Sequence, residues 1–194
     1  PIDLTELQNG DLLFKVASSN LDGVTQAIVS SVEGINLQQV SHVAIVHKHP
    51  DGQIYALEAS GQHGVWLNPI DSFLIHCDHN DKGQPLVLIG RLKDKSIIDS
   101  SVKKALTYIG RPYDYQYLPG DSAIYCSELV HLAFEDAKGE KVFPQNPMSF
   151  HNSDGTIIPF WIDYYKKWDM DVPEGMQGTH PGGISRSNKI KIIG

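Results

Sequence analysis

Cysteine is scarce in this sequence: only Cys77 and Cys126 occur among 194 residues. Small domains held together by disulfides carry many more cysteines, so a disulfide framework is excluded. The two cysteines also lie in different settings, Cys77 in a His-Cys-Asp-His run and Cys126 in Tyr-Cys-Ser-Glu-Leu. We therefore predict two free thiols, one of which is functional.

Long apolar runs and basic clusters are missing too. No apolar run approaches the roughly 18 residues of a membrane span. The chain has 16 Lys and Arg against 23 Asp and Glu, a formal net charge of -7, and no basic stretch suited to a phosphate backbone. These features argue against nucleic acid as a partner, and they define no oligomeric state.

Neither a signal segment nor an initiating Met is visible, since the sequence begins at Pro1. We predict an exported protein of the periplasm or cell envelope, close to a membrane or cell wall, with a cytoplasmic location as the alternative.

The hydrophobic pattern predicts one α+β domain over residues 1–194, with an antiparallel sheet packed against helices. Its C-terminal tail, from about 173 to 194, is predicted to be irregular because it is rich in Gly, Ser and Pro. The aromatic stretch 159–165 fits either a strand or a helix. The other predicted elements are strands at 12–16, 41–47, 53–59, 64–67 and 86–91, a short helical turn at 70–75, and helices at 20–33, 97–109 and 126–138.

Cys126 opens the last of these helices, after a Pro-Gly turn. The first N–H groups of a helix lack backbone partners, and the positive helix end stabilises a thiolate. Cys126 also shares the apolar face formed by Leu129, Val130 and Ala133. A buried cysteine is often only a core residue, so it is the position that favours a nucleophile.

His42 and Glu58 lie in two neighbouring strands of a predicted hairpin. Pairing Val46 with Gln53 or Ile54 would bring His42 close to Glu58. A buried, unpaired carboxylate is costly, and an imidazole N–H is a suitable partner for it. Cysteine, histidine and carboxylate together form a set of nucleophile, base and orienting group. A core histidine with a structural role is the alternative.

The remaining candidates favour structural roles. The run His76-Cys77-Asp78-His79 and the pair His47 and His49 lack the spacing of a zinc site, so we predict polar loops, no metal and no cofactor. An aromatic group is predicted to pack in the core rather than line a substrate groove: Trp161, Tyr164, Tyr165 and Trp168.

Two motifs carry a resemblance to a known family. The stretches Gly-Arg-Pro-Tyr-Asp-Tyr at 110–115 and Tyr-Cys-Ser-Glu-Leu-Val at 125–130 resemble the nucleophile region of NlpC-type papain-like peptidases. In the common form the cysteine precedes the histidine, whereas here His42 and Glu58 precede Cys126. This order resembles the circularly permuted branch, the YiiX-like amidases, which are distantly akin to the lecithin-retinol acyltransferase type. The similarity covers residues from about 8 to 165.

The resemblance implies a papain-like fold and a role for each site residue. Cys126 would be the nucleophile, His42 the general base and Glu58 the residue that orients His42. Tyr113 matches a tyrosine whose hydroxyl assists the oxyanion, or it packs under the helix. Tyr125 would line the cleft. The residues around Cys126 depart from the Asp-Cys-Ser-Gly pattern of the non-permuted enzymes, which weakens any transfer of their peptide specificity.

We therefore predict a bacterial cysteine hydrolase that cleaves an amide or ester through an acyl-enzyme. Its substrate would be a small cell-envelope peptide or an N-acylated or lipid-linked amide. Two alternatives remain: an acyltransferase with the same chemistry, and a catalytically silent module that binds envelope peptides or lipids.

Overall fold

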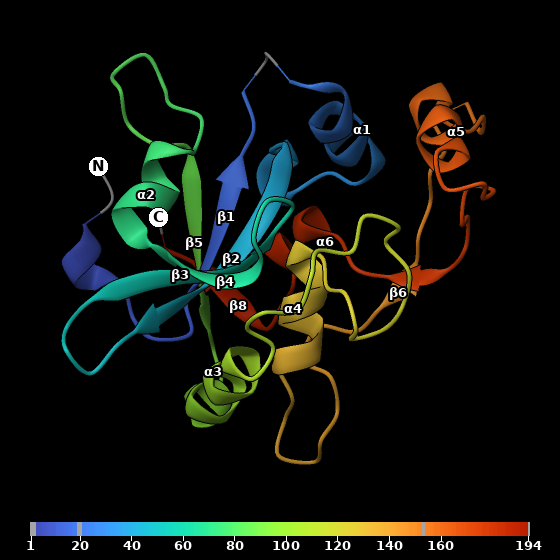
Figure 1. The fold of residues 1–194 in the computed structure, drawn as a ribbon. Coiled ribbons are helices and arrows are strands. Elements are labelled where there is room, and N and C mark those ends of the chain that lie inside the picture. The colour runs from blue at the N-terminus through green and yellow to red at the C-terminus, as the bar shows by residue number, and fades with distance from the viewer. Residues whose placement is uncertain (1–2, 19–20, 153, 194) are drawn as a thin grey trace.

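A six-stranded antiparallel sheet forms the centre of the computed structural model, which describes residues 3–18, 21–152 and 154–193 (Figure 1). The strand order is β4-β3-β2-β1-β5-β8, and every neighbouring pair runs antiparallel. The strands are β1 (Leu12–Val16), β2 (Val40–Lys48), β3 (Ile54–Ser60), β4 (Gly64–Pro69), β5 (Val87–Leu92) and β8 (Ile190–Ile192). The predicted α+β class with an antiparallel sheet is confirmed.

The described residues form six α-helices, which surround or extend this sheet. They are α1 (Gly23–Ser31), α2 (Ile70–Ile75), α3 (Ile98–Leu106), α4 (Cys126–Ala133), α5 (Pro159–Lys166) and α6 (Pro181–Ser185). Three 3-10 turns and a two-stranded ribbon complete the described elements: η1 (Leu4–Glu6), η2 (Ile35–Leu37), η3 (Lys95–Ile97), β6 (Asn146–Pro147) and β7 (Gln177–Gly178). Among the residues that the structure describes, no helix is both long and apolar enough to cross a membrane.

Alternation along the strands gives the sheet two apolar faces. Leu12, Val43 and Leu57 belong to the core beneath α3, α4 and α6. Leu13 and Ala44, their chain neighbours on β1 and β2, belong to the opposite core, which α2 covers. Figure 1 shows α2 on one side of the sheet and α3, α4 and α6 on the other.

A third cluster lies away from the sheet, between α1 and α5. Tyr165 is fully buried at its centre, which confirms core packing for this aromatic, and Trp161 is buried beside it. Trp168 is 42% exposed instead. The predicted helix containing α1 begins at residue 20, which lies outside the described residues.

One predicted helix boundary is wrong. The helix that begins at Cys126 ends at Ala133, because Phe134 is extended (φ -91°, ψ 108°) and the chain then forms a bridge between Glu135 and Lys141. Gly139 occupies the turn between the two bridge residues with φ +81°.

The prediction of an irregular tail from about 173 is also wrong. This segment contains β7, α6 and β8, and β8 pairs with β5 at the edge of the sheet. Pro181 suits the first position of α6, and the His180 ring accepts a hydrogen bond from the Gly182 N–H at 3.0 Å. The alternation of Ile190, Lys191 and Ile192 places both isoleucines against the sheet core.

Candidate active site

The hairpin of β2 and β3 positions His42 and Glu58 side by side. In its register Val46 lies opposite Ala56, whereas the predicted partners of Val46 were Gln53 and Ile54. Even-numbered residues of both strands therefore share one face, which brings His42 to Glu58. The His42 Nε2 atom lies 2.5 Å from the Glu58 Oε2 atom.

Glu58 is almost fully enclosed, with 3% of its side chain exposed. Its second oxygen, Oε1, accepts a hydrogen bond from Asn68 Nδ2 on β4 at 2.8 Å. Both oxygens thus have partners, which offsets the cost of burying the charge. Because Glu58 accepts the Nε2–H proton, Nδ1 is the ring nitrogen left for a second partner.

Electrostatics in this pair favour the charged forms. Burial opposes charge on His42, but the Cys126 sulfur and the Glu58 carboxylate outweigh it and raise the pKa of His42 to about 9. Burial likewise opposes charge on Glu58, yet hydrogen bonds from His42 and Asn68 hold the pKa of this carboxyl below its ordinary value. The stabilisation from the His42 imidazolium is fully present below about pH 6.5 and is lost as pH rises through about 9.

Cys126 reaches this pair from the core beneath α3, α4 and α6. It is the first residue of α4, after the extended N-cap residue Tyr125 (φ -96°, ψ 169°), and α4 packs on both β2 and β3. The Cys126 sulfur lies close enough to the His42 ring to raise the pKa of its imidazole. The structure thus brings together all three residues proposed for the reaction, while their catalytic roles stay a prediction.

The two predicted cleft tyrosines both lie beside Cys126. Burial, together with Tyr117 and Cys126, raises the pKa of Tyr113 well above its ordinary value, so its hydroxyl is a neutral donor. The Tyr125 hydroxyl is fixed by the Thr179 N–H, which donates to it at 2.9 Å. Tyr113 is therefore the tyrosine suited to an oxyanion, whereas Tyr125 is held in the wall of the pocket.

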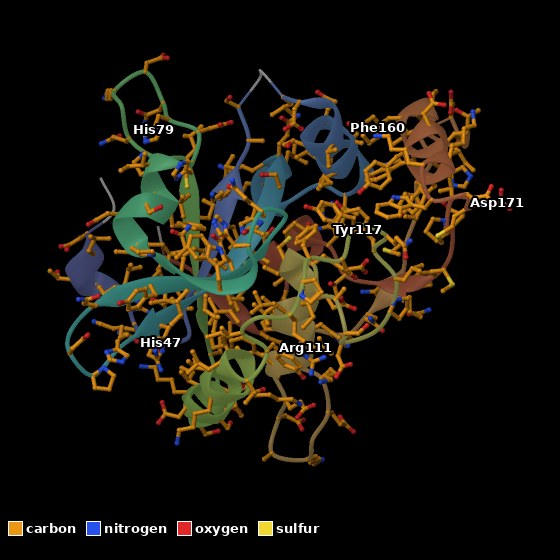
Figure 2. All side chains as sticks on the ribbon, in the orientation of Figure 1. His47, His79, Arg111, Tyr117, Phe160 and Asp171 are labelled. Carbon is orange, nitrogen blue, oxygen red and sulfur yellow. The ribbon has the colours of Figure 1, made fainter. Side chains whose placement is uncertain are left out.

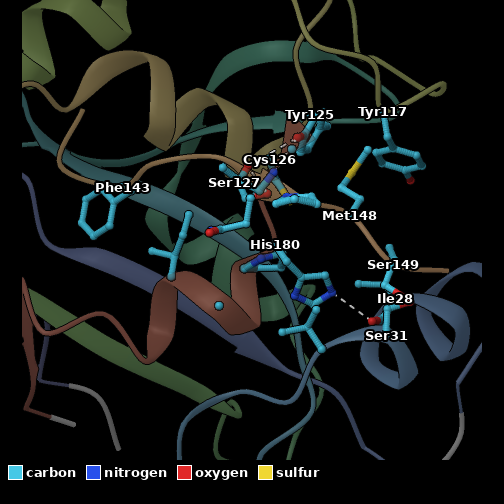
Figure 3. A pocket seen from close by; sticks show the side chains of 18 of the residues that line it. Ile28, Ser31, Tyr117, Tyr125, Cys126, Ser127, Phe143, Met148, Ser149 and His180 are labelled. Carbon is cyan, nitrogen blue, oxygen red and sulfur yellow. Dashed lines mark hydrogen bonds between the residues drawn. The ribbon is translucent and has the colours of Figure 1, made fainter. Parts of the chain in front are cut away.

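Two pockets meet at this centre, because Ser41 and Tyr113 line both of them. The first, of about 540 Å³, contains Cys126 in its wall. Figure 3 shows Cys126, Tyr125, Met148 and His180 around it. Most of its side chains are apolar or aromatic, including Ile28, Phe143, Met148, Phe150, Trp161 and Ile184. The second pocket, of about 520 Å³, contains His42 and Glu58 and is lined mainly by polar residues.

A family model described as permuted papain-like amidase enzyme, YaeF/YiiX, C92 family, matches residues 6–194. The chain belongs to this family. The sequence resemblance to the permuted branch and the papain-like fold are thereby confirmed. The YaeF/YiiX assignment makes the chain a member of a papain-like amidase family.

Two relatives illustrate the similarity. The uncharacterized protein YiiX of Escherichia coli K12 is 26% identical over 144 residues, which cover 73% of this chain and 64% of YiiX. The chain thus aligns with less than two thirds of that relative. A crystal structure of the metalloprotein yiiX from Escherichia coli O157:H7 has a TM-score of 0.74, 20% identity and 96% coverage of each chain. At 20% identity, the similarity to this crystal structure shows a shared fold alone.

The candidate metal ligands of this YaeF/YiiX member are dispersed or engaged elsewhere. In residues 3–18, 21–152 and 154–193, no group of three or more His, Cys, Asp and Glu side chains is placed to hold a metal ion. Cys77 Sγ donates to the Phe73 carbonyl at 3.2 Å, and Asp78 accepts the Ser18 N–H at 2.6 Å. Figure 2 shows His47 and His79 at well separated places.

Two supporting residues escaped the sequence analysis. Asn68 occupies a buried position of β4, and a polar residue at the end of an apolar stretch was the available signal. Glu128 is fully buried at the third position of α4, where its Oε1 atom accepts a hydrogen bond from the Gly120 N–H at 3.3 Å. A carboxylate among the apolar residues of this helix was the available signal.

Glu128 gives a stability prediction. Burial, followed by the nearby Asp114, raises the pKa of Glu128 to about 8. Between about 4.5 and 8 the folded protein keeps a proton that the unfolded chain has lost, so this residue makes stability fall as pH rises. We expect the melting temperature of Glu128→Gln, taken relative to that of wild type, to increase from pH 5 to pH 8.5. Thermal unfolding at several pH values checks this, and a constant difference would contradict it.

Proposed function

We propose that this protein is a cysteine amidase that hydrolyses N-acyl amides with an apolar acyl group, through an acyl-enzyme on Cys126. The observation that carries the proposal is the position of Cys126 in the wall of the apolar pocket, where its sulfur acts on the charge of His42, which is in turn bonded to Glu58. Apolar pockets with a few placed polar groups are typical of sites for small ligands.

Formation of the acyl-enzyme follows from this geometry. The Cys126 thiol gives its proton to His42 Nδ1, and the resulting thiolate attacks the amide carbonyl. A C–S bond forms as the carbonyl electron pair moves to oxygen. The Cys126 backbone N–H at the helix start and the Tyr113 hydroxyl are the donors for this oxyanion.

Collapse of the intermediate breaks the C–N bond. The His42 imidazolium transfers its proton to the departing nitrogen, so an amine leaves and a thioester remains on Cys126. His42 then takes a proton from water, the hydroxide oxygen attacks the thioester, and the carboxylic acid and the thiol are released. Glu58 holds the tautomer and orientation of His42 throughout.

Chain-length dependence tests the acyl assignment. With N-acyl ethanolamines of two to twelve acyl carbons, we expect kcat/KM to rise by about fourfold per added CH₂ while the chain still enters the pocket, because burial of a methylene is worth about 0.8 kcal/mol. Mass spectrometry of the products with added alcohol or amine acceptors separates hydrolysis from acyl transfer. Equal rates at all lengths, or cleavage of envelope peptides alone, would reject the apolar acyl group.

A further inference from the structure

Lys15 places a positive charge in the polar pocket, next to the proposed base. It lies on β1 directly opposite His42 of β2, so the two side chains share a face of the sheet. Both residues line the second pocket, together with Glu58, Asp78 and Ser41. Directly opposed residues have Cβ atoms about 5 Å apart, so the ammonium lies within reach of a group bound at His42.

The ammonium of Lys15 is only partly engaged. Its Nζ atom donates to the His76 carbonyl at 3.3 Å and lies 4.4 Å from the centre of the Phe73 ring. Within the described parts of the chain, no carboxylate forms a salt bridge with it. An ammonium has three N–H donors, so donors remain for a ligand in the pocket.

The two carboxylates that share the pocket are already committed. Glu58 is bound by His42 and Asn68, and Asp78 accepts the Ser18 N–H. Neither therefore competes strongly for the Lys15 ammonium at short range. The pocket thus offers a cation in a mainly polar wall.

The chemistry assigns this pocket to one half of the substrate. His42 must give its proton to the departing nitrogen, so the amine half lies on the side of the ring, in the polar pocket. The acyl half remains beside Cys126 in the apolar pocket. A charge recognised by Lys15 therefore belongs to the amine half and is only a few bonds from the scissile nitrogen.

We infer that Lys15 binds an anionic group, a carboxylate or a phosphate, on the amine half of the substrate. This inference rests on the proposed amidase function and specifies its substrate class as N-acylated amines that carry a negative charge, such as N-acyl amino acids. An ammonium pairs with either anion through charge-assisted hydrogen bonds.

A competing role is electrostatic tuning of the proposed triad. Lys15 is close enough to Glu58 to contribute to the lowering of its pKa, after the effects of burial, His42 and Asn68. A residue that acted only in this way would affect every substrate equally. Substrate charge therefore separates recognition from tuning.

Three substrates with the same decanoyl chain make this test: N-decanoylglycine, N-decanoyl-O-phosphoethanolamine and neutral N-decanoylethanolamine. We expect wild type to favour at least one anionic substrate over the neutral one by about tenfold or more in kcat/KM. Lys15→Met should remove most of this preference by raising KM, and Lys15→Arg should keep it. Lys48→Met is the matched control, because Lys48 Nζ donates to the Leu7 carbonyl at 3.0 Å and does not line either pocket.

The outcomes are distinguishable. Loss of the preference in Lys15→Met, with little change on N-decanoylethanolamine and in the Lys48→Met control, supports anion recognition. The anionic substrate with the higher kcat/KM identifies the carboxylate or the phosphate as the group recognised. Turnover of all three substrates without a charge preference, or an equal loss on all three in Lys15→Met, overturns the inference and leaves the proposed function standing. Absence of turnover on all three by wild type rejects the substrate class and, with it, this role of Lys15.

Discussion

We expect replacement of Cys126 by serine to lower kcat/KM by about 10³-fold or more, because a serine hydroxyl in this site lacks the nucleophilicity of sulfur. The fold should persist, since the change is nearly isosteric and Cys126 is only one member of the core beneath α4. Turnover of an N-acyl amide and thermal unfolding measure the two effects separately.

Cys77 provides the matched control. Both cysteines are free, and each is 6% exposed, so exposure does not distinguish them. Burial raises the pKa of Cys77 to about 11, and its thiol follows the C-terminal end of α2, where the helix dipole disfavours negative charge. Cys126 instead lies at a helix start and beside His42.

Cys77→Ser should therefore keep full turnover and remain sensitive to iodoacetamide. Modification at pH 7.5 should occur at Cys126 first, about 100-fold faster than at Cys77 in wild type. Full activity of Cys126→Ser would reject Cys126 as the nucleophile. It would leave an amidase-like fold whose chemistry depends on other residues.

The parts of the site that could be predicted share one property: each has a signal in its local sequence. Glu58 is a carboxylate in an apolar strand, and its need for a partner points to His42. Cys126 follows a turn at the start of an apolar helical stripe. Both signals lie within a few residues, so the sequence alone is sufficient to find them.

The register of the hairpin could not be fixed in this way. The turn is closed by His49, whose N–H donates to the Gln53 carbonyl at 2.8 Å. The partner of Val46 therefore lies further along the chain than either predicted partner. Pairing Val46 with Gln53 would have turned Glu58 to the face opposite His42, whereas the predicted alternative with Ile54 kept the correct face. The observed partner, Ala56, has the same parity as Ile54.

Residues whose roles depend on distant pairing left no local signal. β8 is only three residues long, and its partner β5 lies about 100 positions earlier, so the tail gave no periodic pattern that was long enough to read. Lys15 is an ordinary lysine in a short strand until the pairing of β1 with β2 sets it opposite His42. Both cases depend on the order of strands in the sheet.

Removal of the charge at Glu58 is the second change with a large expected effect. Glu58 raises the pKa of His42 through both a hydrogen bond and its charge, in addition to the effect of Cys126. Glu58→Gln keeps the shape and an oxygen that accepts the Nε2–H, but it lacks the charge. The pKa of His42 should then fall below about 9, and activity that requires the imidazolium should be lost at a lower pH.

Glu58→Ala removes the acceptor as well as the charge, so His42 loses both its tautomer and its orientation. We expect about 10³-fold loss of kcat/KM in Glu58→Ala and a smaller loss, with an alkaline limb moved to lower pH, in Glu58→Gln. Asn68→Ala is the control, because it removes one hydrogen bond to Glu58 and leaves the carboxylate beside His42. Its alkaline limb should stay near that of wild type. Profiles of kcat/KM against pH for the three variants decide the matter: a limb that does not move in Glu58→Gln means that the carboxylate orients the ring without sustaining its charge.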